Sequence, residues 1–392
     1  MVPMPEIDRD ERCPSDPGPV GTPMEAYDYG LPEEAIAQRP ADPRSSARLL
    51  VAPGVDGNEA ARHALVSNLP ELVRPGDVVV VNDTKVLAGR LSLVKASGGR
   101  AEVLLLEPVD AGPQEPVDAG AQEPVDAGPQ EWEALVRPGR RLPEHTLLSE
   151  AEGGPPVIEV GPVLDGADDG RRVVRLVDPG VVERSGRMPL PPYLDGPPGD
   201  PGRYQTVYAT ERGMGNRSAA APTAGLHFTP SLLEALGRAG ATLARVDLAI
   251  GLDTFRPVTA PTAEAHVIHS ERYSVPAETM AACLDAERVV AVGTTTVRAL
   301  ESAAATGSLS GRTGLYIHGP YPFRMVDLLV TNFHLPRSSL LLLVESFGGP
   351  GWRELYATAL REGYRFLSFG DAMVVGRSDP NGGRPARKGG RR

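Results

Sequence analysis

The sequence predicts an α/β protein: a main domain with a mainly parallel sheet flanked by helices, and a smaller inserted domain that is an antiparallel barrel or sandwich. In the predicted main domain, apolar strand-like segments that end in polar residues alternate with helical segments, which is typical of a parallel sheet covered by helices. From Arg90 to about Val177, short alternating segments are separated by Gly and Pro, which is typical of antiparallel strands. A chain of 392 residues is long enough for two domains.

The predicted boundaries make the main domain discontinuous. We expect residues 25–89 and 178–377 to form the main domain, and residues 90–177 to form the inserted domain. The chain would leave the main domain after its first strands and return to it in the extended, Pro-rich stretch that begins near Gly186.

Three further segments have compositions that cannot build a core. Residues 1–24 are rich in Pro, Asp and Glu, residues 378–392 are rich in Gly, Pro and Arg, and we expect both to be disordered. Residues 107–131 form a low-complexity loop of the inserted domain, for which we expect no function. The direct repeats in this loop start at Glu107, Glu115 and Glu123.

Composition and charge restrict the class of protein. No apolar run is long enough to cross a bilayer, and the polar amino terminus does not resemble a secretory signal, so we expect a cytoplasmic protein without a membrane partner. Cys13 and Cys283 form no CxxC pair or disulfide framework. The formal net charge of −11 argues against a nucleic-acid partner, although net charge does not describe a local patch.

Polar residues follow three of the predicted strands. The fully apolar run Val78–Val81 ends in Asn82, Asp83 and Thr84. Two later runs end in Gly-Thr-Thr and Thr-Asn-Phe-His motifs, which contain Gly293, Thr294 and Thr295 and then Asn332 and His334. Each motif alone could simply cap the next turn. Because open α/β sheets bind ligands at the carboxyl ends of their strands, three such motifs together predict one ligand-binding crevice.

A loop of small residues precedes a predicted helix at Pro230. Thr229 suits the N-cap, and Pro230 suits the first helical position. Small residues allow a ligand to approach the backbone, and a helix start favours an anion, so His227 could project into a binding site. The alternative is a packed connection with a hydrogen-bonded histidine, and this segment taken alone favours that alternative.

His266, His269 and Glu271 form the other histidine-containing motif. Two histidines and a carboxylate can bind a metal, but no third histidine motif or cysteine cluster is near, so we expect no metal. A strand that places His269 and Glu271 on one face is simpler, and one of these residues could act as a general base. Tyr204 and Tyr208 are predicted to lie one helical turn apart, either in the core or at a ligand.

The motifs, in their order along the chain, resemble those of the S-adenosylmethionine:tRNA ribosyltransferase-isomerase family of queuosine synthesis. The resemblance covers roughly Tyr27 to Val375. Local departures occur at Ala249 and Asp253, where the family usually has His and Gly, and at Met214–Ser218, which is longer than usual. The matching segments are Asn82–Leu87, Met188–Tyr193, Tyr204–Ala209, Ala221–Thr229, Thr254–Val258, His269–Glu271, Val292–Glu301, Thr331–Pro336 and Ser368–Met373.

The resemblance implies an α/β main domain with an inserted β-barrel, and it implies a reaction. The ribosyl part of S-adenosylmethionine would move, with isomerisation, to 7-aminomethyl-7-deazaguanine in tRNA, giving epoxyqueuosine, adenine and methionine. The sulfonium acidifies the C5′ protons, so that a base can remove one, and the amine of the acceptor base attacks C1′. S-adenosylmethionine is then a co-substrate, no cofactor or metal is needed, and the chain is expected to be a monomer that binds tRNA.

The resemblance also implies roles for individual residues. His227, or His269 with Glu271, would transfer the proton. Gly293, Thr294 and Thr295 would hold an anionic group, and Asp83, Arg256 and Asn332 would orient the substrates. The other expected substrate contacts are Asn82, Thr84, Tyr204, Gln205, Thr223, Gly225, Phe228, Thr254, Arg298 and His334.

Two alternatives follow from the departures at Ala249 and Asp253. The chain could use the same donor on a different, small-molecule acceptor, or it could be a non-catalytic protein that binds the donor or RNA. Adenine release with a mass gain of the tRNA would support the first function, release only with another acceptor the second, and binding without turnover the third.

Overall fold

The apolar run Val78–Val81 forms the centre of strand β3 (Asp77–Asn82), in which every residue is buried. The structure is a computed structural model that describes residues 21–55, 57–109, 131–139, 142–164, 170–196, 200–211, 217–251 and 257–378. β3 lies inside a nine-stranded sheet, between two parallel neighbours. β-branched residues suit a strand that packs on both faces, which explains the position of this run.

The large sheet is parallel at its centre and antiparallel toward both edges. β12, β3, β14 and β16 pair in parallel, as do β17 and β1, whereas the other neighbouring pairs are antiparallel. The predicted α/β class is confirmed, and the sheet is more mixed than expected. In spatial order its strands are β15 (Ser310–Thr313), β13 (Glu271–Ser274), β12 (Thr242–Leu248), β3, β14 (Arg288–Val292), β16 (Leu328–Asn332), β17 (Ala372–Gly376), β1 (Arg48–Val51) and β2 (Arg62–Leu65).

The helices of the main domain begin close to the expected positions. The Thr229 hydroxyl accepts a hydrogen bond from the Leu232 N–H at 3.2 Å, and the Ser338 hydroxyl accepts one from Leu341, as N-caps do. α4 begins at Thr294, earlier than expected, because Gly293 adopts φ +92° and turns the chain out of β14. The α-helices are α1 (Val181–Ser185), α2 (Pro230–Arg238), α3 (Ala277–Asp285), α4 (Thr294–Thr306), α5 (Ser339–Gly348) and α6 (Trp352–Arg361).

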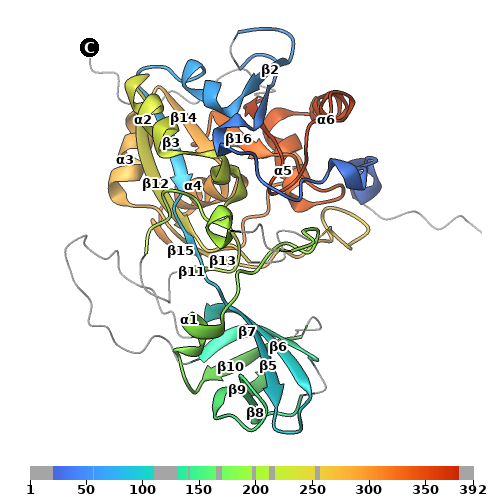
Figure 1. Cartoon of the computed structure of the whole chain (residues 1–392). Coiled ribbons are helices and arrows are strands. Elements are labelled where there is room, and N and C mark those ends of the chain that lie inside the picture. Colours follow the sequence, from blue (N-terminus) through green and yellow to red (C-terminus); the bar gives the residue numbers. More distant parts are fainter. Residues whose placement is uncertain are drawn as a thin grey trace, which may run out of the picture.

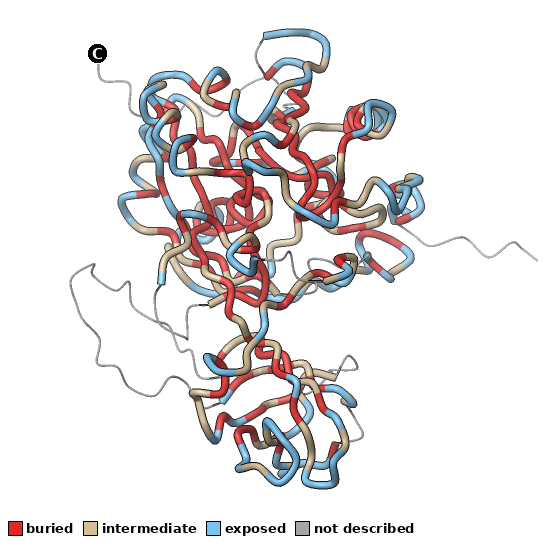
Figure 2. Tube along the Cα trace, viewed as in Figure 1, coloured by how far each residue is buried: buried red, intermediate tan, exposed pale blue. Residues whose placement is uncertain are grey.

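Six antiparallel strands form a closed barrel between residues 90 and 176, below the main domain in Figure 1. The sequence did not predict β8, because its few residues carry no clear alternation. The barrel has its own buried core, centred on Trp132 and separate from the core of the main domain (Figure 2). In order around the barrel, the strands are β10 (Arg171–Leu176), β7 (Glu131–Arg137), β6 (Arg100–Pro108), β5 (Arg90–Lys95), β8 (Thr146–Ser149) and β9 (Pro156–Val163).

Short elements connect the barrel and the sheet. β4 (Lys85–Val86) follows β3 and pairs in parallel with β11 (Arg217–Ser218). The 3₁₀ helices are η1 (Met24–Tyr27), η2 (Glu33–Ala35), η3 (Arg44–Ser46), η4 (Val66–Glu71), η5 (Pro201–Tyr204) and η7 (Thr223–His227).

Two local predictions were wrong. In the described segment 200–211, η5 ends at Tyr204 and Gln205 is extended, so Tyr204 and Tyr208 are not one helical turn apart. The Gln205 side chain fixes this conformation by two hydrogen bonds with the Val86 backbone. His269 lies before β13 rather than within it, since β13 begins at Glu271.

Some expectations lie outside the described residues. They include the disorder of residues 1–20 and 379–392, most of the repeat at 107–131, and the lead-in that begins at Met214. Order begins before the expected boundary, because Met24 is buried and starts η1.

Candidate active site

The carboxyl ends of the central parallel strands meet at one edge of the large sheet. β3 ends at Asn82, β14 at Val292 and β16 at Asn332. From β3 the chain continues through β4 into the first barrel strand, and the barrel lies beyond this end of the sheet (Figure 1). The polar motifs therefore lie at the edge where open α/β sheets bind ligands.

A cavity of about 520 Å³ lies between the barrel and the main domain. β6, β7 and β10 contribute its barrel wall, and the segments around β13, α4 and α5 contribute the opposite wall. Its volume is in the range of small-molecule sites, which is about 300–1,000 Å³. Of the predicted site residues, His269, Glu271 and Arg298 line this cavity, as does Ala249.

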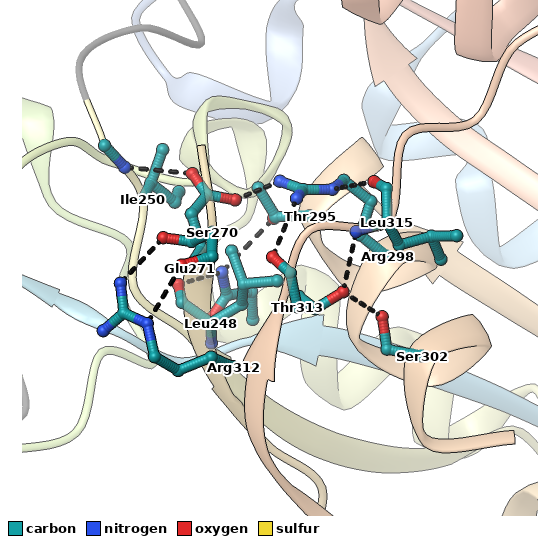
Figure 3. Close-up of polar contacts among 12 residues, drawn as sticks. Leu248, Ile250, Ser270, Glu271, Thr295, Arg298, Ser302, Arg312, Thr313 and Leu315 are labelled. Carbon is teal, nitrogen blue, oxygen red and sulfur yellow. Dashed lines mark hydrogen bonds and ion pairs between the residues drawn. The ribbon is translucent and has the colours of Figure 1, made fainter. Parts of the chain in front are cut away.

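Glu271 and Arg298 form a buried ion pair in the wall of the cavity (Figure 3). Their side chains are only 9% and 7% exposed. The second oxygen of the Glu271 carboxylate accepts the backbone N–H of Gly251 at 3.0 Å, and Arg298 Nε donates to the Leu315 carbonyl at 3.0 Å. The pair therefore joins β13, α4 and two loops that line the cavity.

The barrel brings a second set of charges to the cavity. Arg171 of β10 pairs with Glu133 of β7 at 3.1 Å, and its other terminal nitrogen lies 3.1 Å from His269 Nδ1. Arg312 of β15 donates to both carboxylate oxygens of Glu107 in β6, at 2.8 and 2.9 Å. These contacts hold the barrel against β13 and β15, and they place carboxylates and guanidinium groups on both sides of the cavity.

The Asn82 motif binds other parts of the protein rather than lining the cavity. The Asn82 side chain donates to the Leu248 carbonyl at 3.0 Å and to Thr295 Oγ1 at 3.2 Å, and it accepts from Leu248 N–H. The buried Asp83 carboxylate accepts from the Thr210 hydroxyl at 3.0 Å. Thr84 is buried, and its N–H donates to Asn82 Oδ1. These contacts fix the exit of β3.

His227 lies in a separate buried group with Asn332 and Thr223. Asn332 Nδ2 donates to His227 Nε2 at 3.1 Å, and Asn332 Oδ1 accepts from the Thr223 hydroxyl at 3.0 Å. Burial lowers the pKa of His227 to about 4, so its imidazole is neutral near pH 7. The packed histidine that we weighed for this loop is what the structure contains.

His334 is buried beside the same group. Its Nε2 lies 2.9 Å from the Thr331 hydroxyl, and burial lowers its pKa to about 3. Thr223, Asn332 and His334 line a small cavity of about 30 Å³. Leu340 of α5 lines both cavities, which makes them neighbours. The predicted residues that line a cavity thus form two adjacent groups rather than one crevice.

The Gly-Thr-Thr motif forms the turn at the start of α4. Gly293 is at φ +92°, its N–H donates to the Val330 carbonyl, and Thr294 and Thr295 are buried. Thr295 accepts from Asn82, so this helix start is attached to β3. These residues lie outside the lining of the large cavity, and Arg298, one turn later, reaches it.

Tyr204, Gln205, Gly225 and Phe228 pack into the protein interior. Tyr204 and Phe228 are fully buried, and Gln205 binds the Val86 backbone. A Cβ at Gly225 would collide with the Tyr208 hydroxyl, which explains the glycine by packing alone.

Thr254, Arg256 and Asp253 lie outside the described residues. The described residues on either side of them, Gly251 and Pro257, line the large cavity.

The barrel's contribution to the site could not be predicted from the sequence. Arg171, Glu133 and Glu107 belong to strands whose alternation shows only which side is buried, and nothing in the sequence indicates that they face the main domain. Tyr316 and Leu340 were also missed, since a single Tyr or Leu in an apolar context carries no signal. His266, which we considered only as a metal ligand, lines the cavity.

The described part of the chain contains neither a membrane-spanning helix nor a metal-ligand cluster. There, no helix is both long and apolar enough to cross a membrane. The same residues contain no cluster of three or more His, Cys, Asp or Glu side chains that could hold a metal ion.

An α/β sheet with a charged cavity between its carboxyl edge and a barrel is the arrangement of an enzyme that acts on a small molecule between two domains. Comparison with known proteins identifies the family. Residues 24–375 match the family model described as "Queuosine biosynthesis protein", and the chain belongs to this family.

Named relatives match along most of their length. The protein from Rubrobacter xylanophilus is 48% identical over 351 residues, covering 89% of this chain and 96% of the relative. The proteins from Moorella thermoacetica and Thermus thermophilus are each 44% identical, covering 90% of this chain and 99% of each relative. All three are named S-adenosylmethionine:tRNA ribosyltransferase-isomerase.

A solved structure also matches. It is the crystal structure of S-adenosylmethionine tRNA ribosyltransferase from Thermotoga maritima, 32% identical, with a TM-score of 0.48, covering 89% of this chain and 99% of that one.

Proposed function

We propose that the chain is an S-adenosylmethionine:tRNA ribosyltransferase-isomerase. It transfers and isomerises the ribosyl moiety of S-adenosylmethionine onto 7-aminomethyl-7-deazaguanine in tRNA, and it releases adenine and methionine. The family and the named relatives of the chain support this activity. The charged cavity of about 520 Å³ between the barrel and the sheet is the observation that supports the location of the active site.

The charges of the cavity suit the donor. S-adenosylmethionine carries a sulfonium, an ammonium and a carboxylate. Glu107 and Glu133 on the barrel wall can attract the cationic groups, and Arg171 can bind the carboxylate. These three side chains come from the barrel and the opposite wall comes from the main domain, so the donor would be held across the interface, with its reactive C5′ between the two walls.

Glu271 and Arg298 position the site rather than transfer protons. Both oxygens of the Glu271 carboxylate already accept hydrogen bonds, one from Arg298 and one from Gly251. A base must accept a proton through a free lone pair at the right place. The ion pair instead holds β13, α4 and the two loops of the wall together.

His269 is our candidate for the proton acceptor at C5′. It lines the cavity and is exposed, and once the carboxylate of the donor draws Arg171 away from its ring it can meet both the bound donor and an acceptor base that arrives from solvent. Histidine is the side chain that most often serves as a general base in enzymes. His227 is less suitable because it is buried outside the cavity lining and has a pKa of about 4.

The acceptor base has to leave the stack of bases in its tRNA. Enzymes that modify a base bring it out of the stack into a pocket. The exposed His269 marks the part of the cavity where such a base would enter. We further propose that the chain works in the cytoplasm as a monomer and without a metal or bound cofactor.

The test is an incubation of the purified chain with S-adenosylmethionine and tRNA that carries 7-aminomethyl-7-deazaguanine. We expect release of adenine together with a mass gain of the tRNA, both absent with tRNA that carries guanine at that position. Adenine release only with a small-molecule acceptor, or donor binding without any release, would contradict the proposed function.

A further inference from the structure

An aromatic group forms part of the cavity wall opposite the charged residues of the barrel. Tyr316 and His266 both line the cavity, and their ring centroids are 5.3 Å apart in an edge-to-face arrangement of 73°. His318 lies 4.5 Å from the Tyr316 ring, tilted by 34°, and is outside the lining. Of the two histidines in contact with the Tyr316 ring, only His266 therefore shares the cavity wall with it.

The position of Tyr316 is fixed on both sides along the chain. The preceding residue, Leu315, accepts a hydrogen bond at 3.0 Å from Arg298, whose guanidinium is held in turn by Glu271 (Figure 3). The following residue, Ile317, is buried. The ion pair of the cavity wall thus also orients the backbone that presents the Tyr316 ring.

The Tyr316 side chain is uncharged, and its hydroxyl makes no hydrogen bond to the described residues. Burial, with a contribution from Glu264, raises the pKa of Tyr316 to about 12. Its hydroxyl has no hydrogen-bond partner among the residues that the structure describes. A buried hydroxyl without a partner calls for an explanation, and a ligand that fills the cavity beside Tyr316 is one that fits the lining.

We propose that Tyr316, edged by His266, is a stacking surface for a nucleobase in the cavity. Aromatic side chains stack on bases because every base has a π face, and this contact tolerates different bases. The inference rests on the proposed function, in which two bases enter the site: the adenine of the donor and the deazaguanine of the tRNA. The charged barrel residues then hold the amino-acid part of the donor, and the aromatic wall holds a base.

Tyr316→Leu removes the π face and keeps an apolar side chain. We expect this variant to lower the affinity for one of the two ligands by about tenfold, which corresponds to about 1.4 kcal/mol of binding free energy. The dissociation constant of S-adenosylmethionine is measured by calorimetry without tRNA, and the KM for tRNA carrying 7-aminomethyl-7-deazaguanine is measured at saturating donor. A loss only in the first measurement assigns the ring to adenine, and a loss only in the second assigns it to the acceptor base.

Three further variants make the test specific. Tyr316→Phe keeps the ring and should restore the affinity lost in Tyr316→Leu. Tyr321→Leu is the matched control, because Tyr321 is in the same loop, packs on Phe323 and does not line the cavity. Tyr316→Met serves as a second non-aromatic variant if the leucine variant melts at a lower temperature.

The proposal is overturned if the non-aromatic variants bind both ligands as the wild type does, or if Tyr316→Phe loses as much affinity as Tyr316→Leu. The donor titration needs no turnover. A chain that binds S-adenosylmethionine through Tyr316 but does not modify tRNA would therefore refute the proposed function and leave the stacking surface supported.

Discussion

Replacing Arg298 by Met tests whether the buried ion pair organises the cavity wall. The side chains of Arg298 and Glu271 are 7% and 9% exposed, so removing the guanidinium leaves a carboxylate with little water to solvate it. The Leu315 carbonyl also loses its Arg298 donor. Removing one partner of a buried pair costs about 3–5 kcal/mol. In a domain of this size, such a loss lowers the melting temperature by roughly 10 °C.

The assay is urea and thermal unfolding, followed by circular dichroism and tryptophan fluorescence. Trp132 lies in the barrel core and Trp352 in the core of the main domain. The variant should therefore lower the unfolding midpoint that Trp352 fluorescence reports. The double variant Glu271→Gln/Arg298→Met should be more stable than Arg298→Met alone, because it no longer buries an unpaired charge.

Arg238→Met is the matched control for this experiment. Arg238 pairs with Glu234 at 3.6 Å, and both side chains are 70% exposed. Its replacement should change the free energy of unfolding by no more than about 0.5 kcal/mol. If Arg298→Met were as stable as this control, the ion pair would not organise the wall as we have argued.

Three other predictions concern histidines and the barrel contacts. The pKa values of His227 and His334, about 4 and about 3, lie below the unfolded value of 6.5, so only the unfolded chain gains protons as the pH falls from 6.5 toward 4. The free energy of unfolding should therefore fall by about 2 kcal/mol for each of these histidines between pH 7 and pH 5. His227→Gln should make this dependence of the free energy on pH less steep. An unchanged pH dependence would argue against a neutral buried His227. His269→Gln should lower turnover at least tenfold at an unchanged melting temperature, whereas turnover equal to the wild type would exclude His269 as the base. Arg312→Met should raise the KM for S-adenosylmethionine by loosening the barrel, and kinetics at varied donor concentration would detect this rise. In the wild type, added salt should weaken the Arg312–Glu107 ion pair.

The fold was predictable because its signals are local. The β-branched run at Val78–Val81, the cap at Thr229 and the glycine at Gly293 each determine an element from a few neighbouring residues. The alternation between residues 90 and 177 likewise indicated antiparallel strands, and closure into a barrel followed from the resemblance to a family. Register and edge strands such as β15 depend on distant partners and were not predictable in this way.

The site was predictable only in part, because the same residue types serve packing and chemistry. Asn82 at the end of a buried strand suits a ligand, yet its amide binds the neighbouring strand. His227 sits beside a helix start, yet it is neutral and buried. Arg171 reaches the cavity only because the barrel closes and docks, and no spacing in the sequence encodes that contact.

The most direct test is the affinity of S-adenosylmethionine for a chain whose large cavity has been filled. Ala249 lines this cavity, and Ala277, an exposed alanine at the start of α3, offers a matched control. Ala249→Trp should raise the dissociation constant at least tenfold, and Ala277→Trp should leave it unchanged. If Ala249→Trp bound the donor as tightly as the wild type and still modified tRNA, the donor would not lie between the barrel and the sheet.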